Sequence, residues 1–220
     1  MVLSKRLNIL KNFVSKDLDC ADIGADHGLL IISLGNQYFK NKYLGIENKI
    51  GPFNNLNNNI LKLSKNNNVS CKLSDGLKDV LSNFKSIVLA GMGSELIIRI
   101  IKESLNKIIN IDEFVIDAHN NVFKILSFMD EIDFSLDKIE FIKEKEIGYF
   151  LFKFTKNIFC KKTNNLSQFV MFCKNNEEVF LYFKQKNDNK LSYYLKHNNV
   201  ILDEYLIFNR IIERNSYESD

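Results

Sequence analysis

Tryptophan is absent from this sequence, proline occurs once, and the four cysteines stand far apart without a CxxC pair. That spacing disfavours disulfides and metal sites, so we expect buried thiols and no metal. No apolar run approaches the ~20 residues that a membrane helix needs, and the N-terminus lacks the apolar segment of a signal peptide. We therefore expect a cytoplasmic protein with no membrane partner.

The composition is that of an ordinary soluble protein, with 45% hydrophobic and 26% charged residues. A chain of 220 residues can form one domain, or one domain with a small appendage. The net charge of +3 permits an RNA partner without demanding one, because nucleic-acid binders usually concentrate basic charge on one face.

A repeating strand-then-helix rhythm follows a short amphipathic helix within residues 1–17. Strands are expected at residues 18–24, 42–47, 69–74, 86–91 and 113–119, with helices at 28–39, 51–64, 76–84, 94–108 and 121–132. Residues 137–155 are expected to form a closing hairpin of two strands. Because the strands are apolar throughout and alternate with helices, the pattern predicts an α/β fold: a Rossmann-like, mostly parallel sheet with helices on both faces.

The rhythm stops at about residue 157. Beyond it, apolar positions recur at helical spacing and are interrupted by Asn-rich punctuation near residues 186–190. This pattern predicts two helices in an antiparallel hairpin. We therefore expect two domains, residues 1–156 and residues 157–220.

The stretch "DCADIGADHGLL" runs from a predicted strand through a glycine turn into a helix. Gly24 permits a tight turn, and the helix N-terminus near Gly28 offers N–H groups that would hold a pyrophosphate in a dinucleotide enzyme. Asp26 stands beside those groups, where a carboxylate would repel a diphosphate. The loop instead suits a ligand without phosphates and with a cationic amino-acid end, whose ammonium Asp22 could meet. S-adenosylmethionine is such a ligand.

Acidic residues also follow the second and third predicted strands. Glu47, next to Asn48, is placed to accept both hydrogen bonds of a ribose diol, a role that NAD enzymes share; a solvated acid is the alternative. Asp75 could accept a hydrogen bond from an adenine amine while Gly76 lets the backbone approach the ring; a plain Asp-Gly turn is the alternative.

Gly91 and Gly93 flank Met92 after the fourth strand, at the edge where many methyltransferases of this class set the target atom. Four signals at successive strand ends favour S-adenosylmethionine as cofactor. Asp26, where a dinucleotide fingerprint has glycine, disfavours an NAD-linked enzyme. The Asn/Asp-Pro-Pro-aromatic motif of exocyclic amino methyltransferases is missing, which leaves a ring nitrogen as the plausible methyl acceptor.

Five stretches of this sequence carry a more specific resemblance: "LSKRL" at 3–7, "ADIGADHG" at 21–28, "GIENKIGP" at 45–52, "DGL" at 75–77 and "IVLAGMGSELI" at 87–97. Together they resemble the bacterial tRNA (adenine-22-N1)-methyltransferase family, the TrmK type. The resemblance implies a Rossmann-like methyltransferase domain, a coiled-coil-like C-terminal hairpin and a tRNA substrate methylated on N1 of adenine 22. The departures from the family pattern are Leu29-Leu30-Ile31 for Tyr-Leu-Pro, Ser94 for a glycine, and Ala118-His119-Asn120 for Gln-Pro-Asn.

Adenine N1 carries a free lone pair, so its methylation needs positioning and no general base. A nearby carboxylate would stabilise the cationic product. We hypothesise that Asp26 does this or orients the adenine, and that His27 forms a polar wall or contacts the base; the alternative is that the pair only caps the helix. Because N1 of a paired or stacked adenine is hidden, the base would be flipped or locally unpaired.

Basic side chains near the cofactor loop are candidates for phosphate contacts. The "LSKRL" match favours Arg6, with Lys5 and Lys11, while Arg99 and Lys102 are second choices; a solvated side chain is the alternative for each. Two other functions stay open: a methyltransferase acting on another substrate, and a non-catalytic RNA-binding protein with a retained cofactor fold.

Overall fold

The computed structural model describes residues 2–118, 120–145, 147–157, 164–182 and 185. The chain divides into two compact units, Met1–Thr163 and Asn164–Asp220. The strands of the first unit are β1 (Asp19–Ile23), β2 (Tyr43–Glu47), β3 (Val69–Leu73), β4 (Phe84–Met92), β5 (Glu113–Ala118), β6 (Phe134–Glu144) and β7 (Ile147–Lys156). Its helices are α1 (Lys5–Phe13), α2 (Leu29–Gln37), α3 (Ile50–Leu63), α4 (Ser94–Lys102), α5 (Leu105–Ile108) and α6 (Val122–Glu131).

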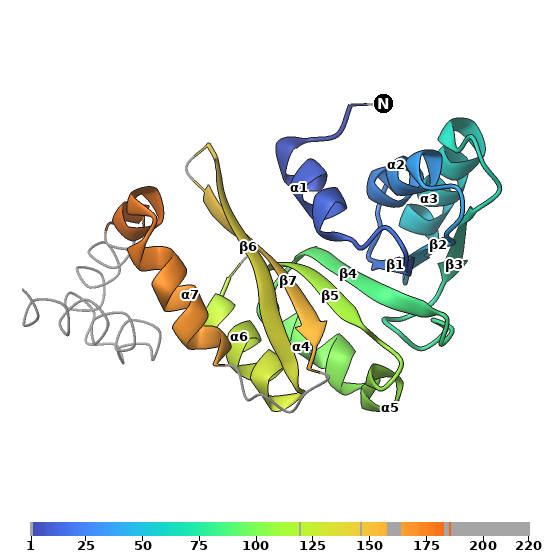
Figure 1. The fold of residues 1–220 in the computed structure, drawn as a ribbon. Helices are drawn as coiled ribbons and strands as arrows, with labels where there is room; N and C mark the ends of the chain where they lie inside the picture. The colour runs from blue at the N-terminus through green and yellow to red at the C-terminus, as the bar shows by residue number, and fades with distance from the viewer. Residues whose placement is uncertain (1, 119, 146, 158–163, 183–184, 186–220) are drawn as a thin grey trace, which may run out of the picture. The chain divides into compact units, whose positions relative to one another are not determined.

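The described strands form one sheet in the order β3-β2-β1-β4-β5-β7-β6 (Figure 1). The first five are parallel, while β7 runs antiparallel between β5 and β6. Helices α1, α2 and α3 lie on one face and α4, α5 and α6 on the other (Figure 1). The predicted Rossmann-like sheet with helices on both faces and a closing hairpin is therefore confirmed.

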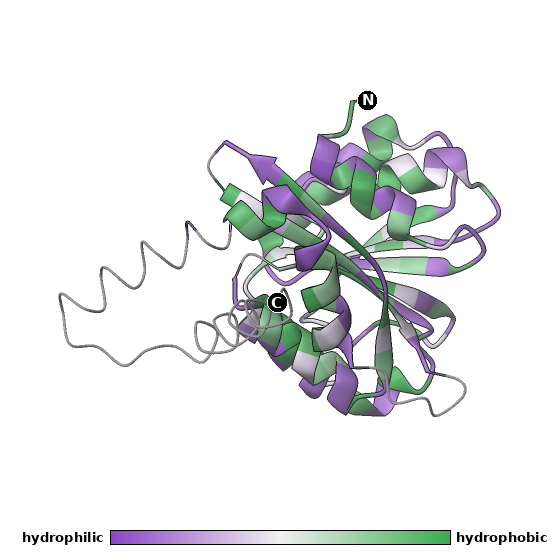
Figure 2. Ribbon diagram, turned by 60° about the vertical axis from the view of Figure 1, so that its left-hand side comes forward, coloured by the Kyte–Doolittle hydropathy of each residue, from purple (hydrophilic) through white to green (hydrophobic). Residues whose placement is uncertain are grey.

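Burial explains why the strands read as apolar runs in the sequence. β2 and β5 are buried along their whole lengths, as expected for strands covered on both faces. Figure 2 shows hydrophobic and hydrophilic residues in both strands and helices, with hydrophilic residues also along the strands of the closing hairpin. Helix α1 begins where the Ser4 hydroxyl accepts a hydrogen bond from the Leu7 N–H, and it ends where Val14 turns extended.

Two predicted helices differ from the structure. Residues 76–83 contain turns rather than an α-helix, Phe84 already begins β4, and three carbonyls of this segment bond a distant side chain. The Lys107 ammonium donates to the carbonyls of Leu77, Lys78 and Val80, so tertiary contacts satisfy groups that a helix would have bonded internally. The predicted helix over residues 94–108 is broken at Ser104, which separates α4 from α5.

The second unit is described only in its first part. It contains α7 (Asn165–Lys174), whose first turn is capped by the Asn164 side chain, and a further helical segment over residues 177–182. The returning helix of the predicted hairpin lies outside the described residues. Among the helices that the structure describes, none is long and apolar enough to cross a membrane.

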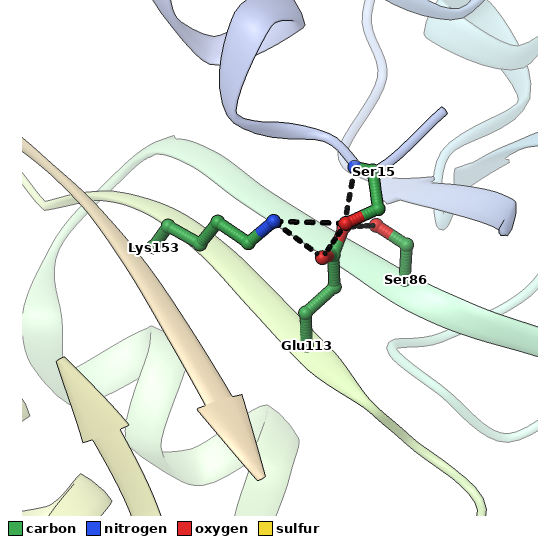
Figure 3. Close-up of polar contacts among 4 residues, drawn as sticks. All are labelled: Ser15, Ser86, Glu113 and Lys153. Atoms are coloured by element: carbon green, nitrogen blue, oxygen red, sulfur yellow. Dashed lines mark hydrogen bonds and ion pairs between the residues drawn. The ribbon is translucent and has the colours of Figure 1, made fainter. Parts of the chain in front are cut away.

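A buried ionic cluster joins four segments at the amino end of the sheet (Figure 3). Glu113 on β5 and Lys153 on β7 form an ion pair with 2.7 Å between Nζ and Oε2. The same carboxylate accepts hydrogen bonds from the Ser15 backbone N–H at 2.8 Å and from the Ser86 hydroxyl at 2.7 Å. Lys153 also donates to the Ser15 hydroxyl. The cluster thereby fixes the α1–β1 connection to the middle of the sheet.

Candidate functional site

A cavity of about 260 Å³ opens at the carboxyl ends of β1, β4 and β5. This edge is where parallel α/β sheets bind their ligands. Its lining consists of Ser4, Arg6, Leu7, Leu10, Asp22, Gly24, Ala25, Asp26, His27, Leu29, Leu30, Ala90, Gly91 and Asp117. The cavity brings together six residues predicted from the sequence: Arg6, Asp22, Gly24, Asp26, His27 and Gly91.

The loop between β1 and α2 is built from left-handed backbone conformations. Gly24 has φ +74°, Asp26 has φ 49° and Gly28 has φ +68°. A Cβ added to Gly28 would lie 2.3 Å from Cδ1 of Leu56 on α3, so a larger residue would need this side chain to shift and would also hold a left-handed backbone. Gly28 does not line the cavity. Its left-handed backbone joins the loop to the start of α2.

Two buried carboxylates lie beside this loop. Glu47, at the end of β2, accepts a 2.5 Å hydrogen bond from the Asp26 backbone N–H through Oε1 and so holds the loop. Asp22, at the end of β1, lines the cavity and is only 5% exposed. Burial, and next the charge of Glu47, raise the pKa of Asp22 to about 7. An acid in this setting favours a positively charged ligand group, which would restore its ionised form.

Asp26 and His27 project from the same loop at the mouth of the cavity. Their side chains are 69% and 58% exposed, and His27 Nε2 lies 3.6 Å from Asp26 Oδ2. The alternative of simple helix capping does not fit the geometry, because α2 starts after Gly28 and receives no side-chain capping bond. Both side chains are therefore accessible to a substrate that reaches the mouth.

Of the three predicted strand-end acids, Glu47 and Asp75 both lie outside the lining of this cavity. Asp75 follows β3, and its Oδ2 accepts a 3.0 Å hydrogen bond from Lys78. That bond and the Lys78 charge, with a smaller contribution from a hydrogen bond with Asn48, lower the pKa of Asp75. Asn48 and Asp75 therefore lie next to each other at the ends of neighbouring strands. Gly76 follows with φ +58°.

The turn after β4 is held by the loop that follows β5. The Asn120 side-chain oxygen accepts a 3.0 Å hydrogen bond from the Ser94 N–H, at the first residue of α4. Gly93 precedes α4, and a Cβ there would lie 3.3 Å from the same Asn120 oxygen. The Met92 methyl group lies 3.1 Å from the position of a Cβ on Gly24, so the β4 turn contacts the β1 loop.

The basic residues predicted to bind RNA occupy different environments. Arg6 pairs with the buried Asp117, with 3.4 Å between Nε and Oδ2, and its guanidinium lies 4.4 Å from the centre of the Tyr149 ring. Lys11 donates to the Ser33 hydroxyl, and Arg99 lies 3.8 Å from Glu103. Lys5 is exposed on α1. The structure thus places Arg6 at the cavity and the other three away from its lining.

Sequence reasoning missed Asp117, Asn120 and Tyr149. Asp117 ends an apolar strand with an acid, which is the signal that identified Asp22 and Glu47, so it could have been found. Tyr149 carried no such signal, because its contact with Arg6 joins the two ends of the first unit. Among the described residues, no group of three His, Cys, Asp or Glu side chains is placed to hold a metal ion.

Comparisons with known proteins agree with this geometry. Residues 3–152 match the methyltransferase-domain family. A Mycoplasma genitalium protein, MG248, whose name assigns it provisionally to the tRNA methyltransferases, is 30% identical over 152 residues, or 67% of each chain. The tRNA (adenine(22)-N(1))-methyltransferase of Bacillus subtilis is 25% identical over 128 residues, which are 58% of this chain and 54% of that enzyme.

A solved structure extends the similarity to the whole chain. TrmK of M. capricolum, in complex with the cofactor product S-adenosyl-homocysteine, is 25% identical and superposes with a TM-score of 0.80. The comparison covers 99% of this chain and 98% of that one.

Proposed function

The chain belongs to the methyltransferase-domain family, and on that premise we propose that it is an S-adenosylmethionine-dependent tRNA methyltransferase acting on N1 of an adenine. The names of its relatives favour adenine 22 as the target. One observation carries the proposal: a cavity at the strand ends that presents the carboxylates Asp22, Asp26 and Asp117 and no cluster of phosphate-binding cations. Such a lining fits a cationic cofactor and opposes a diphosphate.

The residues present fit this cofactor. When bound, S-adenosylmethionine supplies a methyl group on a positively charged sulfur. Asp22 pairs with its ammonium group, because this buried acid faces the cavity and gains a counter-charge there. Glu47 uses Oε1 to hold the Asp26 N–H, which leaves Oε2 to accept from a ribose hydroxyl. Asp75, supported by Asn48, accepts from the adenine amine, while Gly76 lets the ring approach the backbone.

The acceptor side of the cavity lies toward Asp26, His27 and Gly91. Adenine N1 needs no base, so the task of these residues is to hold the ring in line and to exclude water. Asp26 stabilises the positive charge that the ring gains, and its exposure at the mouth leaves it free to meet an incoming base. Gly91, without a side chain, leaves room beside the β4 turn, and Met92 and Gly93 complete that turn.

This activity resides in residues 1–156, with residues 157–220 forming a separate helical unit; the division of the chain into Met1–Thr163 and Asn164–Asp220 supports that arrangement. Lys5, Lys11 and Arg99 are the side chains we assign to phosphate contacts. We expect the protein to act in the cytoplasm, where tRNA is modified.

The deciding experiment incubates the purified protein with labelled S-adenosylmethionine and unmodified tRNA transcripts, followed by mass spectrometry of the nucleosides. We expect 1-methyladenosine from a transcript with adenine at position 22 and none from a transcript with guanine there. Label on a different nucleoside would overturn the N1 assignment. Cofactor binding in calorimetry without transfer to any tRNA would favour a non-catalytic RNA-binding protein, and transfer to a non-RNA acceptor would favour another substrate. An Asp22→Asn control should lose cofactor binding.

A further inference from the structure

The guanidinium of Arg6 is fixed at the edge of the cavity by two other elements. Its Nε lies 3.4 Å from Oδ2 of Asp117 on β5, whose side chain is 1% exposed. Its Cζ lies 4.4 Å from the centre of the Tyr149 ring on β7. The Arg6 side chain itself is 25% exposed, and both Arg6 and Asp117 line the cavity. A cation–π contact and an ion pair together fix the orientation of this side chain.

This environment argues against a phosphate contact for Arg6. Swinging the guanidinium outward to an RNA backbone would break its ion pair with the buried Asp117 carboxylate, which is unfavourable. It would also end the contact with the Tyr149 ring. Lys5, the neighbouring residue on α1, is exposed and could reach a phosphate at no such cost. The positive charge of Arg6 is therefore already used inside the protein.

The composition of the cavity wall points to a different role. No phenylalanine or tyrosine is among the described residues that line the cavity, whose apolar part is formed by Leu7, Leu10, Leu29 and Leu30. The planar cationic or aromatic-like side chains there are Arg6 and His27. A nucleobase that leaves its stack needs a flat surface on which to settle, and proteins supply either an aromatic ring or an arginine plane. Of these two, Arg6 is the one held by the buried Asp117 and the half-buried Tyr149, whereas the His27 side chain is 58% exposed.

We propose that Arg6 is the stacking platform for the target base: its guanidinium, held by Asp117 and Tyr149, receives the face of the adenine that enters the cavity. The inference rests on the proposed function, since it names how that function recognises its base. Asp117 and Tyr149 are then positioning residues, because they act on the base only through the orientation of Arg6. It also predicts that a lysine cannot replace Arg6, because an ammonium carries the charge without the plane.

The test compares Arg6→Lys with Lys5→Ala, the matched change of a neighbouring cation. For each protein, tRNA affinity is measured by filter binding over a range of salt, against a transcript with adenine at the methylated position and one abasic there. We expect Arg6→Lys to lose the preference for adenine over the abasic site, roughly 5- to 150-fold, with the salt dependence unchanged. Lys5→Ala should keep the preference and reduce the slope of log affinity against log salt by about 1.

Kinetics give a second readout. Arg6→Lys should lower kcat for tRNA while cofactor affinity and the urea midpoint stay at wild-type values. Tyr149→Leu, which removes the ring, should reproduce part of the Arg6→Lys defect. Arg6→Lys with wild-type kcat and adenine preference would overturn the platform, because the charge alone would then suffice, as it does for a phosphate contact. A wild-type protein that methylates no tRNA would instead overturn the proposed function.

Discussion

Replacing Lys153 by methionine tests the buried ionic cluster of Figure 3. The change leaves Glu113, whose side chain is 3% exposed, with its hydrogen bonds from Ser15 and Ser86 but without a counter-charge. Breaking a buried pair from one side costs about 3–5 kcal/mol. Because Ser15 and Ser86 still donate to the carboxylate, we expect the lower end, about 3 kcal/mol. For a chain of this size that corresponds to a drop in Tm of roughly 6–12 °C.

The assay is urea unfolding at pH 7, followed by circular dichroism, with Lys85→Met as the matched control. Lys85 lies on the surface with 48% of its side chain exposed, and its Nζ is 3.3 Å from Asp112. An exposed pair of this kind contributes about 0–1 kcal/mol, so the control should stay near wild type. The double variant Glu113→Leu/Lys153→Met should recover much of the loss, because no charge stays buried.

The pH dependence of the same cluster has a defined sign. Burial, the largest influence, raises the pKa of Glu113, but hydrogen bonds from Lys153, Ser15 and Ser86 outweigh it and leave the pKa below its ordinary 4.5. Its stabilising contribution is therefore full above about pH 4.5 and lost as the pH falls through the folded-state pKa. Lys153→Met removes a lowering influence, so its deficit should shrink on acidification. A Lys153→Met protein within 1 kcal/mol of wild type at pH 7, or a deficit constant down to pH 4, would refute this reasoning.

Three further predictions address the cavity and its loops. Because the pKa of Asp22 is raised to about 7, affinity for the cationic cofactor should fall nearly tenfold per pH unit below 7; calorimetry across pH checks this, and a flat profile would contradict it. Asn120→Ala removes the hydrogen bond from the Ser94 N–H and should lower the free energy of unfolding by about 1 kcal/mol and reduce kcat. Asn120→Asp keeps the oxygen acceptor and should stay near wild type. An equal loss in both variants would show that this hydrogen bond does not hold the β4 turn. Gly28→Ala should lower the Tm, because the residue has a φ of +68° and its new Cβ would lie 2.3 Å from Leu56. Gly51→Ala, whose new Cβ would have nothing within 4 Å, should leave the free energy of unfolding unchanged or raise it by about 0.5–1 kcal/mol. Thermal melts of the two variants make the comparison.

Local signals in the sequence were enough for most of the fold. The strand and helix order, the closing hairpin and the enzyme family were predicted and are confirmed, because apolar runs and strand-end acids are visible along the chain. The helix expected at residues 76–84 was wrong. Lys107, far along the chain, binds the carbonyls of that segment, and such a contact leaves no local trace.

The sequence predicted which residues belong to the site, but it did not predict which of them contact one another. Asp22, Gly24, Asp26, His27 and Gly91 meet in one cavity because parallel strands end at one edge of a sheet. The partners of Arg6 could not be deduced, since Asp117 and Tyr149 reach it only through tertiary packing. The lysine within the apolar run "YFLFKFT" is a local sign of the buried cluster, but its partners Ser15 and Glu113 lie far away in the sequence. The roles assigned to the individual site residues stay predictions.

The insertion of β7 between β5 and β6 has a consequence for the order in which the protein is made. Two contacts of the N-terminal segment with β7, Arg6 with Tyr149 and Ser15 with Lys153, join residues that leave the ribosome at opposite ends of the first unit. At about 5–20 residues per second, the N-terminal segment waits roughly 7–30 s for its partners. In the last part of that interval β5 has been made but lacks its neighbour β7, and Arg6 lacks its contact with Tyr149. All residues that line the cavity have been synthesised once Asp117 is made, but the Arg6 side chain acquires both of its partners only when β7 has followed.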